Sequence, residues 1–229
     1  MSDFFRFPHT PHIAWLGQGQ PRDDKVLLPE EAKAFLQADI IIEEKIDGAN
    51  LGFSVSSQGE LRAQNRGHYL GRPFSGQFSR LEAYFAQYED GLIGALSGGL
   101  MLFGEWCAAR HSLGYERLPD YFIAFDVYDT NSLSFYSAKR RDAFASKLGI
   151  AHVSHIGQGR FSLAQLVDSI AKAQSSFRDG DLEGFYLRRD GDQYLESRAK
   201  LVKPGFTQAI GEHWSKRGIE WNGVAYGSL

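Results

Sequence analysis

Residues 40–55 read IIIEEKIDGANLGFSV, and the interpretation of the whole chain starts from this stretch. Three isoleucines open an apolar strand that we expect to continue to about Ile46. A second strand is expected over 51–56, where leucine, phenylalanine and valine alternate with small residues. Gly48 allows a tight turn between the two strands. Strands joined by so short a connection favour antiparallel sheets.

The segments on either side continue this pattern of short elements. Residues 1–30 contain four prolines and are expected to be irregular. Because strands and helices do not alternate regularly, the pattern favours an α+β fold, with mainly antiparallel sheets and flanking helices, over a doubly wound parallel sheet. Helices are predicted at 30–37, 77–88, 138–148, 162–173 and 205–216, and further strands at 61–64, 100–106, 121–128, 184–189 and 193–202.

Length and composition limit the class of protein. The chain has 229 residues, of which 43% are hydrophobic and 23% charged, so it can bury a sizeable core and is not a disordered chain. We expect one domain over residues 1–229. The formal net charge of −3 excludes a strongly basic coat for nucleic acid, but it leaves room for a local basic groove.

Cysteine usage and the apolar runs point to a compartment. Cys107 is the single cysteine, which excludes an intramolecular disulfide and a cysteine cluster for zinc. No apolar run approaches the roughly 20 residues of a membrane span. The first residues lack the charged-then-apolar order of a signal peptide. The sequence therefore predicts a cytoplasmic protein with no membrane partner.

Charge is distributed unevenly along the chain. Residues 21–47 hold eight acids, whereas 60–80 and 198–217 are each rich in arginine or lysine with one acid apiece. If the two basic segments met in space, they would form an anion-binding groove on an otherwise acidic protein.

The most informative side chains are Lys45 and Asp47. The lysine closes the apolar strand, and the aspartate lies two positions on, which places both on one face. Lysine is a covalent nucleophile when its amine is neutral and held against an electrophile. The simpler interpretation is a solvated lysine–aspartate pair before a hairpin turn, and the pattern alone leaves both open.

Several other predicted strands end in charged residues. Acids occur at Glu105, Asp126 and Glu183, each at the end or mouth of an apolar strand. Arg198 and Lys200 set two cations on one face of the last strand. Taken singly, each of these is as readily explained by a solvated strand end.

In order and spacing, these motifs together resemble the covalent nucleotidyltransferases, which comprise ATP-dependent RNA ligases, DNA ligases and mRNA capping enzymes. The resemblance covers about residues 40–206 and is greatest to the RNA ligase branch, as in bacteriophage RNA ligase 2, where the lysine motif also continues as Gly-Ala-Asn. The stretches that carry it are Lys45-Ile46-Asp47-Gly48-Ala49-Asn50, Arg66-Gly67, Phe103-Gly104-Glu105, Ala124-Phe125-Asp126, Glu183-Gly184-Phe185 and Arg198-Ala199-Lys200.

The resemblance implies a nucleotidyltransferase fold around an ATP cleft, and an activity. Lys45 would attack the α-phosphate of ATP and hold AMP covalently. The AMP would pass to a 5′-phosphate end of RNA, nicked or held in a duplex, and a 3′-hydroxyl would then expel it. Mg²⁺ or Mn²⁺ would assist, because carboxylates suit these ions.

The resemblance also implies roles for individual residues. The family's last motif usually carries two lysines two apart, so here either Arg198 or Lys203 would pair with Lys200. The implied catalytic residues are Lys45, Asp47, Arg66 and Lys200; the implied nucleotide-binding residues are Glu44, Lys45, Asn50, Arg66, Glu105, Phe125, Glu183, Arg198 and Lys200; the implied metal ligands are Glu183 and Asp126.

Two alternatives to an RNA ligase stay open on the sequence. One has the same chemistry with DNA nicks as acceptor, and the other is a core that binds nucleotide or nucleic acid without catalysis. Only 23 residues follow Phe206, so we expect no appended OB or C-terminal domain. Grip on nucleic acid would then come from the core, from residues 1–40 or from a partner protein.

Overall fold

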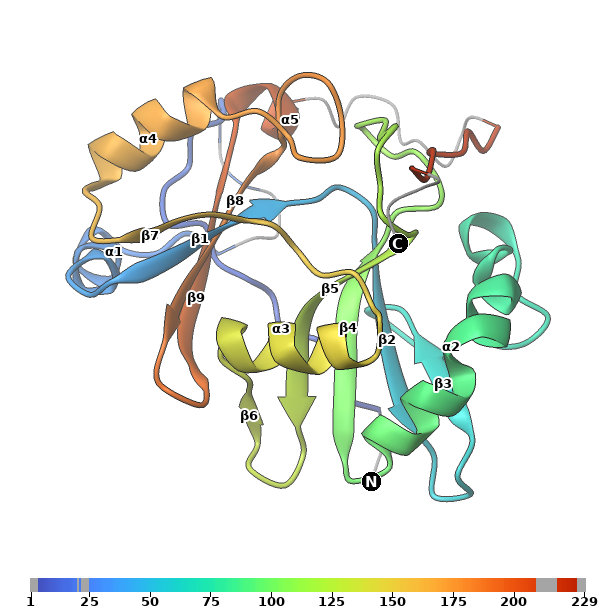
Figure 1. Cartoon of the computed structure of the whole chain (residues 1–229). Coiled ribbons are helices and arrows are strands. Elements are labelled where there is room, and N and C mark those ends of the chain that lie inside the picture. The colour runs from blue at the N-terminus through green and yellow to red at the C-terminus, as the bar shows by residue number, and fades with distance from the viewer. Residues whose placement is uncertain (1–3, 20, 22–24, 209–217, 226–229) are drawn as a thin grey trace.

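The computed structural model describes residues 4–19, 21, 25–208 and 218–225. Within them the strands form two antiparallel sheets, and helices pack against one face of each (Figure 1). The α+β class with antiparallel sheets and flanking helices is confirmed.

The four-stranded sheet has the order β7–β1–β8–β9. One of its faces packs against α1 (Pro29–Leu36) and α4 (Leu163–Lys172), where Ile42 and Phe185 of the strands join Phe35 of the helix in one buried cluster. The strands span Ile40–Lys45 (β1), His155–Gly159 (β7), Gly184–Asp190 (β8) and Leu195–Val202 (β9).

The five-stranded sheet has the order β3–β2–β4–β5–β6. Helices α2 (Leu81–Leu96) and α3 (Ala138–Lys147) share a buried aromatic and aliphatic cluster with this sheet. The strands span Ala49–Val55 (β2), Leu61–Gln64 (β3), Leu100–Trp106 (β4), Phe122–Asp129 (β5) and Ser134–Phe135 (β6).

The connection between β1 and β2 positions the site. The short turn suggested that these strands pair with each other, but each belongs to a different sheet. Residues 46–48 therefore carry the chain from one sheet to the other directly after Lys45. Since no ladder holds these three residues, side chains from elsewhere have to fix them.

Most predicted elements are present, with differences that have local causes. The helix predicted at 162–173 is present as α4, and Ser162 caps its start, because the hydroxyl of Ser162 accepts from the backbone N–H of Gln165. Strand β7 was not predicted, since its sequence HIGQG lacks apolar alternation. Helix α2 ends eight residues beyond the predicted bound, and α5 spans Pro204–Gln208, while the rest of its predicted range lies outside the described residues.

The N-terminal segment is irregular, as predicted, but it contacts the sheet that carries the site. The backbone N–H of Lys200 donates to the carbonyl of Pro11 at 2.9 Å, and that of Ile13 donates to the carbonyl of Lys200 at 2.9 Å. Residues 11–13 thus lie along the free edge of β9. In the described part of the chain, no helix is long and apolar enough to cross a membrane.

Candidate active site

A cavity of about 380 Å³ lies between the two sheets and gathers most of the predicted site residues. A larger cavity, of about 720 Å³, lies at α1 and the start of α4, but the described residues of its walls are mainly apolar and include only Lys33 and Arg160 as charged groups. We therefore place the site in the smaller cavity. It is lined by Phe7, Thr10, Glu43, Glu44, Lys45, Ile46, Gly48, Asn50, Arg66, Glu105, Phe125, Val153, Tyr186 and Lys200.

Lys45 ends β1 at the wall of this cavity. Its Nζ lies 2.7 Å from Oε2 of Glu183, and the lysine side chain is 25% exposed. Burial disfavours the charged ammonium, but the carboxylates of Glu183, Glu105 and Asp47 outweigh it, so the pKa of Lys45 lies above its usual range.

Glu105 lies across the turn from Lys45. Its Oε1 accepts a hydrogen bond from the backbone N–H of Gly48 at 3.0 Å. A Cβ at position 48 would stand 2.6 Å from the carbonyl oxygen of Trp106, so only glycine allows this approach. Burial raises the pKa of Glu105 to about 7; Lys45 opposes the shift and the carboxylate of Glu183 adds to it.

Asn50 lies opposite Glu105 in the ladder between β2 and β4. Its Oδ1 is buried, and no described residue donates a hydrogen bond to it. An unmet acceptor in the wall of a cavity is a place for a ligand donor. The nucleotide-binding role predicted for Asn50 fits this position.

Asp47 does not line the cavity. Its Oδ2 accepts from the backbone N–H groups of Ser112 and Leu113, at 2.7 and 3.0 Å, and its own N–H donates to the hydroxyl of Tyr115 at 2.8 Å. These contacts fix the turn after Lys45. Asp47 therefore has the surroundings of a positioning residue, and the catalytic role suggested for it stays a prediction.

Phe125 reaches the cavity because β5 is irregular at this point. Phe103 and Gly104 of β4 face Asp126 and Ala124, so Phe125 is the extra residue of a β-bulge. Its carbonyl accepts from Nη1 of Arg141 at 2.8 Å. The bulge thus turns an aromatic ring into the cavity wall, where it can stack on a base.

Asp126 was predicted as a metal ligand; in the structure it forms buried ion pairs, and the metal role stays a prediction. Its Oδ1 accepts from Nη1 of Arg188 at 2.6 Å, and its Oδ2 accepts from Nη1 of Arg198 at 2.5 Å. The aspartate is fully buried. Because both oxygens are engaged by guanidinium groups, neither is directed at the cavity.

The remaining predicted residues divide between the cavity and its surroundings. Lys200 and the exposed Arg66 line the cavity. Lys203 lies instead at the loop before β8, where its Nζ is 3.0 Å from Asp181. The carboxylate of Glu44 accepts from the backbone N–H of Ser176 at 2.8 Å, so that group is committed to the loop at 175–176.

Sequence reasoning missed several residues that shape the site. Thr10 and Phe7 come from the N-terminal segment, and the threonine hydroxyl lies 3.1 Å from that of Tyr186. Arg141 lies in α3 and Arg188 lies in β8. The sequence patterns there predict a helix and a strand, but they do not predict that these two arginines are buried beside the site. The proline-rich stretch Pro8-His9-Thr10-Pro11-His12 was a possible signal, but no contact with the site was predicted for it.

The carboxylates suit a divalent cation held together with a substrate. Burial raises the pKa of Glu183, and Lys45 opposes the shift. The carboxylates of Glu183, Glu105 and Asp47 surround the ammonium of Lys45, and the charge of Lys200 also acts on Glu183. Among the residues that the structure describes, no three His, Cys, Asp or Glu side chains are grouped as a complete metal site. Mg²⁺ is commonly held by one or two carboxylates and the phosphates of a substrate, and Glu183 fits that use.

The model of one protein family, described as RNA ligase, matches residues 38–202 of this chain. The chain belongs to the RNA ligase family. Its motifs from the lysine strand to the end of β9 lie within the matched range. No curated protein gives a match.

Solved structures give the same fold. Naegleria gruberi RNA ligase with pyrophosphate aligns at a TM-score of 0.62 and 15% identity, over 87% of this chain and 62% of that one. A point mutant of that ligase with ATP and Mn aligns at 0.56 and 14%, over 77% and 53%. A protein of Aquifex aeolicus, provisionally described as an ATP-dependent DNA ligase, aligns at 0.55 and 20%, over 87% and 50%.

At these identities the likeness establishes the nucleotidyltransferase fold of ATP-dependent ligases. The chain spans between 50% and 62% of the length of these three structures.

Proposed function

We propose that this chain is an ATP-dependent RNA ligase that forms a covalent lysyl-AMP intermediate on Lys45. The observation that carries the proposal is the position of this lysine. Its amine lies at the wall of a cavity of about 380 Å³, 2.7 Å from Glu183, in a cavity that also holds Phe125 and Lys200. A nucleophile, an aromatic face and a cation in one cavity are what nucleotidyl transfer requires.

In the first step, the neutral Nζ of Lys45 donates its lone pair to the α-phosphorus of ATP. A P–N bond forms, the bond to the bridging oxygen of the β-phosphate breaks, and pyrophosphate leaves with the electron pair. The two protons that the ammonium gives up pass to water or to pyrophosphate. Because the pKa of Lys45 lies above its usual range, supplying the neutral amine is a cost of this step.

In the second step, an oxygen of a 5′-phosphate end attacks the AMP phosphorus, the P–N bond breaks, and the lysine recovers its protons. In the third step, a 3′-hydroxyl oxygen attacks the activated 5′-phosphorus and loses its proton. A phosphodiester forms, and AMP leaves with the electron pair. Positioning and charge neutralisation dominate such chemistry.

The residues of the cavity have distinct parts in this scheme. Phe125 stacks on the adenine, and Lys200 neutralises phosphate charge. Arg66 contacts the phosphate of AMP or of the incoming strand. Glu105 accepts from a ribose hydroxyl, and Asn50 offers its unmet acceptor to the nucleotide.

Arg198 keeps a secondary part in this proposal. It lies on the same face of β9 as Lys200, two residues away, but it is bound to Asp126. Lys203 is directed elsewhere. Lys200 therefore carries the phosphate contact, and Arg198 supports the wall beside it.

Glu183 would hold a divalent cation, Mg²⁺ or Mn²⁺. When bound, such an ion supplies charge neutralisation at the phosphates. One of the similar structures, the point mutant of Naegleria gruberi RNA ligase, contains ATP and Mn, which supports this choice of nucleotide and ion.

The two alternative functions, DNA ligation and a core without catalysis, differ in the observations that support them. Sealing of DNA nicks is favoured only by the likeness to the Aquifex aeolicus protein. A core without catalysis is disfavoured, because Lys45, Glu105 and Lys200 all line one cavity and Glu183 contacts the lysine. Residence in the cytoplasm and a partner protein that grips nucleic acid stay predictions.

Intact mass tests the first step. After incubation with ATP and Mg²⁺, the protein should gain the mass of AMP, and Lys45→Ala should lose that gain. Lys172→Ala is the matched control, since Lys172 is an exposed lysine paired with Asp168. An adduct that survives in Lys45→Ala, or the absence of any adduct, would overturn the proposal.

A scan of strand types tests the substrate. Nicked duplexes made of RNA, DNA and RNA–DNA hybrids are offered to the adenylated protein, and joining is followed by gel. Sealing of RNA ends in preference to DNA ends is expected. Preference for an all-DNA nick would make the DNA candidate the function.

A further inference from the structure

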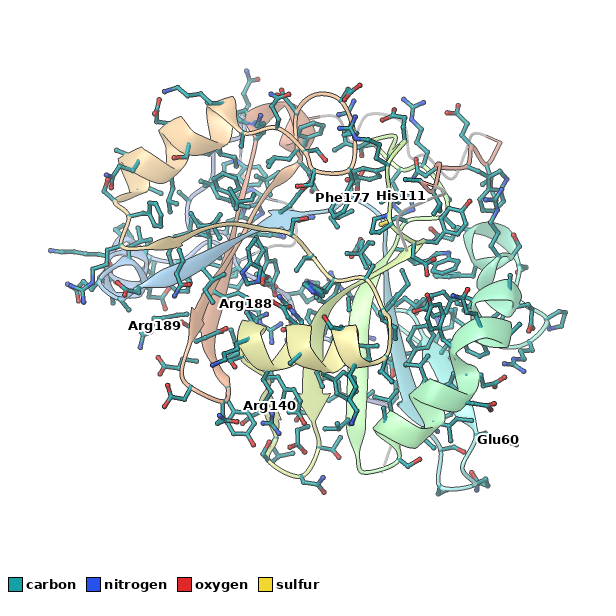
Figure 2. The ribbon with its side chains drawn as sticks, in the orientation of Figure 1. Glu60, His111, Arg140, Phe177, Arg188 and Arg189 are labelled. Atoms are coloured by element: carbon teal, nitrogen blue, oxygen red, sulfur yellow. The ribbon has the colours of Figure 1, made fainter. Side chains whose placement is uncertain are left out.

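The loop over residues 107–118 links the lysine turn to the C-terminal segment of the described chain. On one side this loop holds Asp47, through the hydroxyl of Tyr115 and the backbone N–H groups of Ser112 and Leu113. All three contacts are between 2.7 and 3.0 Å. The turn between the two sheets is therefore fixed by a loop and not by a ladder. Figure 2 labels His111, which belongs to this loop.

On its other side the same loop is held by Asn222, which is 6% exposed. Oδ1 of Asn222 accepts from the backbone N–H of Tyr115 at 2.9 Å. Its Nδ2 donates to the carbonyls of Cys107 and Ala109, at 2.8 and 3.3 Å. Both hydrogens of the amide are thus used, which is the full donor capacity of an asparagine side chain.

Backbone hydrogen bonds also hold residues 222 and 223 against this loop. The N–H of Asn222 donates to the carbonyl of Ala108, and the N–H of Gly223 donates to the carbonyl of Tyr115, both at 2.9 Å. Tyr115 is therefore held at its N–H by the Asn222 side chain and at its carbonyl by the next residue. Its hydroxyl in turn holds the backbone of Asp47.

We propose that Asn222 is a positioning residue for the nucleophile Lys45, acting through Tyr115 and the turn at Asp47. The inference rests on the function proposed above. Asn222 is hydrogen-bonded to Tyr115, and Tyr115 is hydrogen-bonded to Asp47, which lies two residues after Lys45. These contacts connect the C-terminal segment to the lysine turn across more than 170 positions of the sequence. The C-terminal segment thereby helps to position the amine of Lys45.

The effect should be on rate and not on nucleotide binding. Asn222 and Tyr115 do not line the cavity, so contacts to ATP are left in place. A displacement of a reacting atom by about 1 Å can cost about 100-fold in rate. Loosening the turn would therefore lower the rate of attack by Lys45 while the KM for ATP stays close to its original value.

Single-turnover adenylation of Asn222→Ala and Tyr115→Phe tests this split. Each variant should adenylate at least about 10-fold more slowly, with the KM for ATP changed by less than about twofold. Glu220→Gln, two residues away and exposed, is the control and should match the parent protein. Unchanged adenylation in both variants would overturn the proposal.

A second substrate separates positioning from a damaged fold. Joining of an RNA end that already carries AMP needs no attack by the Lys45 amine, so both variants should retain it. Equal loss on this pre-adenylated end would mean that the variants damage the whole site, and the positioning role would be rejected. The double variant should lose no more than the worse single variant, because both changes break one chain of contacts.

Hydrogen exchange at the amide of Asp47 gives a readout that does not depend on activity. This N–H donates to Tyr115, so its exchange should speed up in Tyr115→Phe and in Asn222→Ala, but not in Glu220→Gln. If the parent protein formed no lysyl-AMP, the proposed function would fail, and this measurement would still decide whether Asn222 holds the turn. Unaltered exchange in Asn222→Ala would refute the connection.

Discussion

Two groups of charged side chains lie between the sheets, and they differ in how their charges are balanced. The site cluster consists of Lys45 and Glu105, which line the cavity, and Glu183, which contacts the amine of Lys45 at 2.7 Å. The clamp consists of Glu43, Asp126, Arg141, Arg188 and Arg198, which join the strands of the two sheets and α3.

In the clamp, buried charges meet opposite charges. Arg188 is fully buried and donates to Asp126 and to the carbonyl of Tyr136, and Arg141 donates to Glu43 at 2.7 Å. In the site cluster, two carboxylates share one ammonium, and burial raises the pKa of both acids. The clamp fixes the geometry, whereas the site cluster keeps an excess of negative charge that a cation can neutralise.

The largest effect is expected when the negative charge of the site cluster is reduced. Glu183→Gln keeps the shape of the side chain but removes the charge that would bind a cation. Adenylation should fall by about 100-fold or more at low metal and recover in part at high Mn²⁺, while the free energy of unfolding changes little. Rates of AMP transfer to the protein, measured against metal concentration, provide the check.

Glu196→Gln is the matched control for this variant. Glu196 is an exposed carboxylate on β9 that pairs with Arg189. It should leave adenylation unaltered. Full activity of Glu183→Gln at low metal would rule out the role of Glu183 in the site cluster.

The clamp should respond in the opposite way. Arg188→Met leaves Asp126 and Asp190 short of a buried partner, so the free energy of unfolding should drop by about 3–5 kcal/mol. Arg189→Met is the control, because Figure 2 places Arg188 toward the middle of the molecule and Arg189 at its outer side. The surface pair should cost less than about 1 kcal/mol. Chemical denaturation measures both, and equal losses would contradict the distinction.

The sequence predicted the site cluster better than the clamp. Lys45, Glu105 and Glu183 stand at the ends of apolar strands, where a charge in a local pattern is conspicuous. Arg141 is one of several basic residues in a helix, and Arg188 stands beside another arginine in a strand. Nothing local distinguishes the buried member of either set, since its burial depends on which sheet the strand joins.

The bulge at Phe125 and the change of sheet after Lys45 were unpredictable for a related reason. Alternation of side chains predicts a strand but not the partner with which it pairs. An extra residue in β5 forms a bulge only when β5 is paired with β4, and the sequence of β5 does not show that pairing. The turn residues at Gly48 would be the same whether the two strands formed a hairpin or belonged to different sheets. The same holds for three other features, because each depends on partners that are distant in the sequence. These are strand β7, the contact of the N-terminal segment with Lys200, and the hydrogen bonds of Asn222.

A smaller effect is expected at the edge of the site cluster. Arg66 is exposed at the cavity, where it can meet the incoming strand. Arg66→Ala should slow sealing about 10-fold, the loss of one charged contact of about 1.5 kcal/mol, and slow adenylation less. Each step measured separately checks this, and equal losses would place Arg66 on the AMP alone.

Binding of nicked duplex should depend only weakly on salt. Four cations are candidates for phosphate contacts: Arg62, Arg66, Arg72 and Lys203. Two of them are engaged with acids, Arg72 with Glu89 and Lys203 with Asp181. Because each phosphate contact contributes about 0.9 to the slope on duplex DNA, four contacts would give a slope of about four or less. A steep slope with tight binding would require a larger basic surface.

The smallest effect concerns how pH acts on the site cluster. Glu105 has a pKa of about 7 in the folded protein, against 4.5 as the ordinary value for glutamate. Between these values the folded state binds more protons than the unfolded state, so the free energy of unfolding contributed by this residue falls as pH rises from about 4.5 to about 7. Above that window the contribution is constant.

Glu105→Gln cannot ionise, so its stability should fall less over the same window. Unfolding measured by denaturant at several pH values in both proteins gives the difference, which also cancels the titration of His155, common to the two. Parallel curves would mean that Glu105 is already ionised at pH 5, so that burial does not raise its pKa in the folded protein and both carboxylates of the site cluster carry charge across this range.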